Sequence, residues 1–166
     1  MKLETTFRSE LGLEARAQAE DHLDTRIWLR LLACSTDIEQ VVRRQLRVRF
    51  HTTLSRFDYL AQLERHRDGL RMSELSRCLM VTGGNVTGLT DQLVDEGLVE
   101  RTEDPSDRRV WRVRLTAPGR KRFAQMAAEH ETWLSDLFAG LPMNDKRMLF
   151  QILGQLRSGL RHSAHD

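Results

Sequence analysis

The segment EDPSDRRVWRVRLT, residues 103–116, is the clearest β-forming feature in a chain whose other apolar residues recur mainly at helical spacing. Residues 98–101 and 110–115 fit two strands, and the sequence DPSD between them fits a turn. Two strands alone are only marginally stable in water, so this hairpin must lie against helices. Its charged tip carries two adjacent arginines, Arg108 and Arg109, where the turn ends.

Six helices are expected around the hairpin. Apolar periodicity and cap residues place them at residues 24–47, 56–66, 73–79, 82–96, 117–138 and 144–160. Ser55 with Asp58 forms a capping-box pattern before the second helix, and Thr82 and Thr116 can cap the fourth and fifth. A short helix, a tight turn, a second helix and then a hairpin is the element order of a winged helix-turn-helix.

The composition fits one compact domain, or one domain with appended helices. Apolar residues make up 40% of the 166 residues and charged residues 30%, which argues against a disordered tail protein and against a membrane protein. No apolar run reaches the length of about 18 residues that spanning a bilayer requires. The N-terminus lacks a hydrophobic signal core, so we expect a cytoplasmic protein. Cys34 and Cys78 stand without CxxC spacing, which predicts reduced thiols.

Positive charge is concentrated in two places, although the net charge is only +2. Between residues 41 and 57 there are five arginines and no acid, and a second basic group surrounds the hairpin. The second group comprises Arg108, Arg109, Arg112, Arg114, Arg120, Lys121 and Arg122. Two separate basic patches indicate anion contact at defined places. The alternative is that these arginines pair with the 24 acidic residues on solvated faces.

The hairpin and the helices before it resemble the MarR family of bacterial transcription regulators. The wing signature of that family, D-x-R-x5-L-T, is complete from Asp107 and Arg109 to Leu115 and Thr116. The segment 72–99 looks like the family's helix-turn-helix. The resemblance implies a mostly α-helical fold with one β-hairpin wing, a winged helix-turn-helix with N- and C-terminal dimerisation helices.

The resemblance covers residues 24–160 in element order and residues 54–122 in motif detail. It implies an N-terminal arm and dimerisation helix at residues 1–50, a winged domain at 51–118 and C-terminal dimerisation helices at 119–166. The terminal helices would build a homodimer. Their apolar residues exceed what one small helical layer can bury: Leu134, Leu137, Phe138, Met148, Leu149, Ile152, Leu153, Leu156 and Leu160. The alternative is that these side chains pack only within the monomer.

Double-stranded DNA is the partner that the resemblance implies. The helix at residues 82–96 would enter the major groove by its N-terminal turns. Gly83 and Gly84 place bare backbone there, where N–H groups can approach a phosphate, and Asn85 has the donor and acceptor that read adenine. Gly88 in mid-helix needs a structural reason, which is close approach either to DNA or to the preceding helix. Many family members carry a basic residue at this position, so the wing must supply more of the charge here.

In the family, a wing-tip arginine enters the minor groove and an aspartate braces it. Arg109 holds that position here, with Asp107 as the brace and Arg108 tracking phosphates. The residues expected at the DNA are Arg71, Arg77, Thr82, Gly83, Gly84, Asn85, Thr87, Gly88, Asp107, Arg108 and Arg109. A twofold dimer would require a pseudo-palindromic operator, and blocking of a promoter favours repression. Alone, the hairpin could equally be a surface turn with an internal ion pair.

Regulators of this kind usually release DNA when a small molecule binds in a crevice between the dimer base and the winged domain. The candidate effector-binding residues are Trp28, Arg30, Arg43, Arg44, Arg47, Arg49, His51 and Phe57. Apolar walls with arginines would suit an aromatic acid or its coenzyme A thioester. The alternative is that Trp28 is a core residue and that the arginines are solvated or face DNA.

Other functions have weaker support in the sequence. The peroxide-sensing branch of the family has its reactive cysteine where Trp28 stands here, and Cys34 has no evident cationic partner for a redox switch. The six histidines are scattered, so no metal site is expected. Phosphate-loop, HExxH and G-x-S-x-G motifs are absent from the sequence, so we expect neither enzyme activity nor a cofactor. A winged-helix module that binds protein instead of DNA is the remaining alternative.

Overall fold

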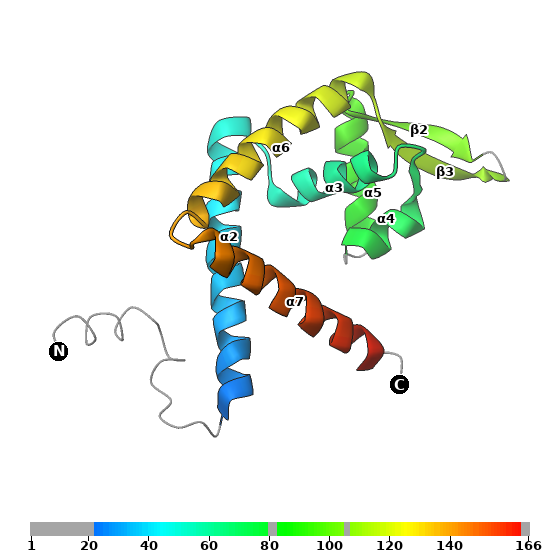
Figure 1. Cartoon of the computed structure of the whole chain (residues 1–166). Coiled ribbons are helices and arrows are strands. Elements are labelled where there is room, and N and C mark those ends of the chain that lie inside the picture. Colours follow the sequence, from blue (N-terminus) through cyan, green and yellow to red (C-terminus); the bar gives the residue numbers. More distant parts are fainter. Residues whose placement is uncertain (1–21, 80–82, 105–106, 164–166) are drawn as a thin grey trace, which may run out of the picture. The chain divides into compact units, whose positions relative to one another are not determined.

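The computed structural model describes residues 22–79, 83–104 and 107–163 (Figure 1). The chain divides into two compact units, Met1–Arg56 and Phe57–Asp166. No helix among the described residues combines the length and the apolar character needed to cross a membrane.

The first unit contains α2 (Leu23–Phe50), which confirms the long helix expected at residues 24–47. The helix ends where His51 adopts a left-handed conformation, with φ at 53°. The N–H group of His51 donates to the Arg47 carbonyl oxygen at 3.1 Å. The N–H group of Thr52 donates to the Leu46 carbonyl oxygen at 3.3 Å. These two bonds close the helix end in the way that left-handed C-terminal caps do.

The next helix, α3 (Leu54–Arg65), begins earlier than predicted. The hydroxyl of Thr53 accepts a hydrogen bond from the Arg56 N–H group at 3.3 Å. The predicted capping box at Ser55 is therefore wrong, because Ser55 already lies in the first helical turn and Thr53 supplies the oxygen that an N-cap needs.

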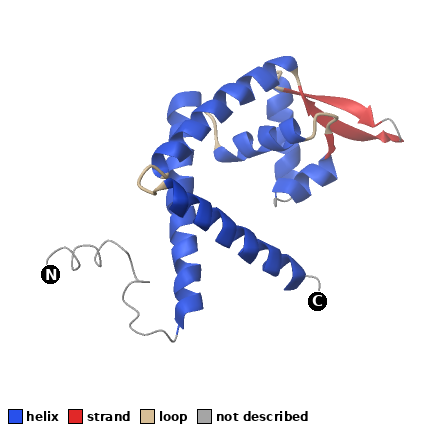
Figure 2. Ribbon diagram, viewed as in Figure 1, coloured by secondary structure: helices blue, strands red, loops and turns tan. Residues whose placement is uncertain are grey.

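The second unit is helical with one small sheet (Figure 2), which confirms the predicted fold class. Its remaining elements are β1 (Leu70–Arg71), α4 (Met72–Leu79), α5 (Gly83–Asp95), β2 (Val99–Asp104), β3 (Asp107–Leu115), α6 (Ala117–Leu137) and α7 (Met143–Ser163). The three antiparallel strands have the order β1-β3-β2. The hairpin of β2 and β3 was predicted, whereas β1 was missed because two residues are too short to show alternation.

The core of the second unit lies between the sheet and helices α3 to α6. Its fully buried apolar side chains are Leu60, Leu63, Leu75, Val86, Leu93, Val99, Val113, Leu115 and Met126. By contrast, α7 leaves large apolar side chains exposed on the single chain, and Phe150 is 81% exposed. The others on this helix are Met143, Met148, Leu149, Ile152, Leu153, Leu156 and Leu160.

One buried polar contact joins α3 to α5. The Tyr59 hydroxyl lies 2.5 Å from the Thr90 hydroxyl oxygen, and Thr90 in turn donates to the Val86 carbonyl oxygen at 2.7 Å. Tyr59 and Thr90 are both fully buried. Burial raises the pKa of Tyr59 to about 12, against the smaller opposing effect of the Thr90 hydrogen bond. The neutral hydroxyl is thus part of what holds α5 in place.

We expect this contact to fail at high pH. Because the pKa of Tyr59 is higher in the folded than in the unfolded chain, its contribution to stability is complete below pH 10 and is lost as the pH approaches 12. Tyr59 is the one tyrosine of the chain, so Tyr59→Phe removes this titration alone. The free energy of unfolding of the wild type relative to Tyr59→Phe should fall by about 2 kcal/mol between these pH values in urea titrations. A constant difference would contradict the assignment.

The start of α6 packs backbone against backbone. The Thr116 hydroxyl oxygen accepts from the Gly119 N–H group at 3.0 Å, which confirms Thr116 as the cap, and it lies 2.6 Å from the Gly97 carbonyl oxygen. A Cβ atom on Gly119 would lie 1.9 Å from the Leu98 carbonyl oxygen. Glycine at residue 119 therefore lets the helix begin against the chain that enters β2.

Gly119→Ala is expected to lower the free energy of unfolding by about 3 kcal/mol, because the backbone of Leu98 must move. Gly88→Ala is the matched control. A Cβ on Gly88 meets no described atom within 4 Å, so the same substitution should raise stability by about 1 kcal/mol through helix propensity. Urea unfolding at one protein concentration compares both variants. Equal effects of the two substitutions would contradict the close approach.

Candidate nucleic-acid interface

The predicted recognition helix is α5, which runs from Gly83 to Asp95. The backbone of Gly83, Gly84 and Asn85 forms its first turn, as expected. Thr82, the predicted cap, lies outside the described residues, as does the side chain of Asn85. Their roles at DNA stay predictions.

The two faces of α5 differ sharply in burial. Val86, Thr90 and Leu93 are buried at the spacing of one helix face, whereas Thr87 and Gly88 are exposed. Because a Cβ on Gly88 would meet no described atom within 4 Å, the suggestion that this glycine admits the preceding helix is wrong. Close approach to DNA is the alternative that remains. A bare backbone on the exposed face is suited to it.

The electrostatics of α5 are unusual for a helix that binds DNA. The helix contains no lysine or arginine. It has two exposed acids, of which Asp91 forms an ion pair with Arg101 of β2, and Asp95 ends the helix. The positive charge for a nucleic-acid contact must therefore come from other elements.

The wing-tip residues Asp107, Arg108 and Arg109 begin strand β3. The pairing of β2 with β3 changes register between Glu103 and Asp104, and Asp104 pairs with Asp107 at the end of the hairpin. The side chains at residues 107–109 lie outside the described part of the structure, so the bracing of Arg109 by Asp107 stays a prediction.

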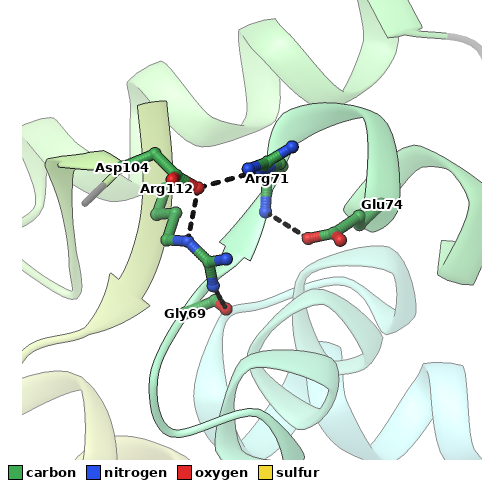
Figure 3. Close-up of polar contacts among 5 residues, drawn as sticks. All are labelled: Gly69, Arg71, Glu74, Asp104 and Arg112. Atoms are coloured by element: carbon green, nitrogen blue, oxygen red, sulfur yellow. Dashed lines mark hydrogen bonds and ion pairs between the residues drawn. The ribbon is translucent and has the colours of Figure 1, made fainter. Parts of the chain in front are cut away.

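Ion pairs link the strands of the wing below its tip, and one network centres on Asp104, a residue that the sequence analysis did not single out (Figure 3). The Asp104 carboxylate is 2% exposed as a residue and accepts from the Nε–H groups of Arg112 and Arg71 at 2.7 and 2.9 Å. Arg114 pairs with Glu100 at 2.7 Å on the exposed face. For Arg112 and Arg114, on the strands below the tip, the alternative that the hairpin arginines pair with acids is therefore correct.

Two predicted DNA contacts lie on or beside α4. Arg71 precedes the helix, and its Nε–H is bound to Asp104, so any contact with DNA would come from a guanidinium already held in place. Arg77 is exposed in the last turn of α4. Neither assignment is tested by these positions, and both stay predictions.

The predicted effector residues fall in both units. Trp28, Arg30, Arg43, Arg44, Arg47 and Arg49 lie on α2, and His51 ends that helix. Trp28 is 60% exposed on the single chain, and Arg43 Nε–H donates to Glu39 at 2.7 Å. An open depression of about 280 Å³ is lined by Asp37, Gln40, Val41 and Arg44, and so includes one of the predicted residues.

Phe57 belongs to the second unit, where it is buried. Its ring centroid lies 5.6 Å from that of Phe123 and 4.9 Å from that of His130, both on α6. The environment of Phe57 is accordingly a packed aromatic cluster. The effector crevice that was expected to combine Phe57 with α2 stays a prediction.

The described residues offer little for redox or metal chemistry. Cys34 and Cys78 are exposed thiols, far apart in the sequence. Within the described part of the chain, no three histidine, cysteine or acidic side chains are grouped so that they could hold a metal ion.

The short helix α4, the helix α5 with one exposed face and the antiparallel hairpin of β2 and β3 follow one another in the chain. This order defines a winged helix-turn-helix protein. The family model described as MarR family matches residues 52–110, which span α3, the two helices of the motif and the start of the wing. Over these residues the chain is similar to the MarR family of transcription regulators.

Sequence relatives support the assignment. The chain is 28% identical over 144 residues to YdgJ of Bacillus subtilis, an HTH-type transcriptional regulator, and this covers 81% of the chain and 87% of YdgJ. It is 31% identical over 97 residues to the transcriptional repressor MprA of Escherichia coli, covering 58% of the chain and 55% of MprA. The second alignment therefore spans only about half of that relative.

Solved structures have the same fold. A MarR family transcriptional regulator from Silicibacter pomeroyi is 29% identical, with a TM-score of 0.71 over 87% of this chain and 99% of that one. Sco3205 from Streptomyces coelicolor, solved in complex with DNA, is 25% identical, with a TM-score of 0.68 over 81% of this chain and 85% of that one.

Proposed function

We propose that the protein is a cytoplasmic, DNA-binding transcription regulator, a repressor that binds its operator as a homodimer and leaves it when a small molecule binds. The observation that carries the proposal is the exposed face of α5, open beside Gly88, together with a wing that has the complete D-x-R-x5-L-T signature. The DNA complex of Sco3205, a protein of the same fold, supports the choice of partner.

In this proposal α5 enters the major groove. Gly83 and Gly84 bring backbone N–H groups at the helix N-terminus close to a phosphate, where the helix dipole favours negative charge. Asn85 binds the edge of an adenine, and Thr87 contacts a thymine methyl group or a phosphate. Gly88 lets the helix lie close to the groove wall, because no side chain keeps the two apart.

The wing supplies the charge that α5 lacks. Arg109 enters the minor groove, where narrow stretches attract arginine strongly, and Arg108 lies along the phosphates. Minor-groove contact of this kind senses groove shape more than base identity. Base specificity therefore rests on α5, and a large part of the affinity rests on the tip of the wing.

The exposed apolar face of α7 is the basis for the homodimer. Ile152, Leu156 and Leu160, which share one face of the helix by their spacing, are 54%, 43% and 62% exposed on the single chain. A contiguous apolar face of this kind marks a surface that another molecule covers. A twofold dimer presents two copies of α5, so its operator has two half-sites about 10 base pairs apart.

The proposed release by a small molecule involves α2. The arginine-rich C-terminal half of α2 and the exposed Trp28 support an anionic aromatic ligand, such as an aromatic acid or its coenzyme A thioester. Release of bound DNA on addition of such compounds is the direct test.

The wing residues can be tested by binding to the DNA upstream of the protein's own gene at two salt concentrations. Arg109→Ala should weaken binding about ten- to hundredfold, the size of effect that loss of one well-placed groove arginine has. Arg108→Ala should weaken it less and should reduce the salt-dependence slope by about one unit, since one phosphate contact is lost. Arg114→Ala is the charge-matched control, because Arg114 is paired with Glu100 below the tip.

Equal effects of the three substitutions would show that only net charge matters. Salt-insensitive binding, or no binding by the wild type at low salt, would instead favour a winged helix that contacts protein.

Gly88→Ala tests the close approach of α5 to DNA. The variant should be more stable than the wild type by about 1 kcal/mol and yet bind the operator several-fold more weakly, because its methyl group lies on the exposed face. Thermal unfolding and fluorescence anisotropy with labelled operator give the two quantities. Unchanged affinity would mean that the groove wall does not approach Gly88.

A further inference from the structure

Two arginines face each other on neighbouring strands of the sheet. Arg71 of β1 and Arg112 of β3 are direct register partners. Like charges directly opposite each other on adjacent strands destabilise the pairing. Strand β1 is only two residues long, so this repulsion affects one of its two register pairs.

The Asp104 carboxylate forms ion pairs with both arginines and so offsets their repulsion. Its side chain is 1% exposed, and the single oxygen Oδ2 accepts from Arg112 Nε at 2.7 Å and from Arg71 Nε at 2.9 Å. The arginine side chains are 28% and 37% exposed, so the buried member of the cluster is the acid. A carboxylate this deeply buried is stable only with such partners, and its removal leaves the two cations opposed.

Each arginine also bonds to a second part of the fold (Figure 3). Arg112 Nη1 donates to the Gly69 carbonyl oxygen at 3.1 Å, in the turn before β1. The backbone N–H of Arg71 donates to the Glu74 carboxylate at 2.8 Å, in the first turn of α4. This is the half of a capping box in which the third residue of the helix binds back to the cap. One carboxylate thereby connects the chain that enters the helix-turn-helix to both strands of the wing.

Asp104 also has a particular place in the wing. It is the last residue of β2, and the strand pairing changes register between Glu103 and Asp104. Asp107, Arg108 and Arg109 begin β3 three residues later in the chain. Fixing Asp104 therefore fixes the point from which the tip extends.

We propose that Asp104 is a positioning residue for DNA binding, which sets the direction of the wing relative to α4 and α5 so that the recognition helix and Arg109 engage DNA together. The inference rests on the proposed function. Asp104 itself need not touch DNA, and its negative charge would repel phosphates if it did.

The sign of the expected effect separates this role from simple electrostatics. Asp104→Asn makes the protein more positive, and charge alone would then strengthen binding to a polyanion. Loss of wing positioning should instead weaken it. We expect a Kd about tenfold higher, comparable to the loss of one arginine contact. Glu100→Gln is the matched control: it makes the same charge change on β2, at an exposed pair with Arg114, and should shift Kd by less than about twofold.

A double-mutant cycle with Arg109→Ala provides a readout that a purely structural role would not move. If Asp104 positions the wing, Arg109→Ala should have little further effect in the Asp104→Asn background, although it has a large effect in the wild type. Binding by Asp104→Asn as tight as wild type overturns the inference. So does weakened binding in which Arg109→Ala retains its full effect.

Amide hydrogen exchange tests the same inference without DNA. In Asp104→Asn, exchange should accelerate in the peptides covering residues 70–71 and 107–113 and remain unchanged in α6, and Glu100→Gln should resemble the wild type. Unchanged exchange in the wing peptides overturns the inference whether or not the wild type binds DNA. Failure of the wild type to bind overturns only the proposed function.

If Asp104→Asn does not fold, the cycle is run with Arg71→Gln. This variant removes the link to β1 and keeps the pair of Arg112 with Asp104 inside the hairpin. Positioning predicts that Arg71→Gln and Arg109→Ala are non-additive, whereas an independent phosphate contact of Arg71 would be additive and would overturn the inference.

Discussion

The carboxylate of Asp104, buried between Arg71 and Arg112, permits a three-stranded sheet in which two arginines are direct partners. Because β1 leads straight into α4, this carboxylate also fixes where the helix-turn-helix begins relative to the hairpin. Arg112 also donates to the Gly69 carbonyl oxygen, and the backbone N–H of Arg71 donates to Glu74. These contacts extend the network to the turn before β1 and to the first turn of α4. The geometry needed to bring a helix and a hairpin onto the same DNA thus depends on one acidic side chain.

The distribution of charge complements that geometry. Helix α5, the proposed recognition helix, has no basic residue, and its exposed Asp91 is paired with Arg101. Below the tip, Arg112 and Arg114 are likewise paired with acids of β2. The tip carries the arginines of the family's wing motif, Arg108 and Arg109. We propose a division of labour on DNA, in which α5 provides shape and hydrogen bonds and the tip provides positive charge.

Much of this fold follows from local sequence patterns. Apolar periodicity predicts the six helices of the described residues, and Thr116 caps α6 as its sequence indicates. What depends on tertiary pairing was not predictable: β1 is too short for a pattern, and Asp104 becomes a partner of Arg71 only through the register of β1 with β3. Ser55 and Thr53 both carry the hydroxyl that an N-cap needs, so the sequence alone does not distinguish them. The hydrogen bond from Arg56 N–H identifies Thr53 as the cap of α3. Gly88 was recognised as anomalous, but only the open space beside it distinguishes the two explanations.

Methylation interference on the operator would test the placement of α5 and the wing together, because N7 of guanine lies in the major groove and N3 of adenine in the minor groove. Two clusters of N7 interference about 10 base pairs apart, each flanked by N3 interference, are expected for a twofold dimer with α5 in the major groove and Arg109 in the minor groove. N7 interference without any flanking N3 interference, or interference in a single half-site, would contradict this arrangement.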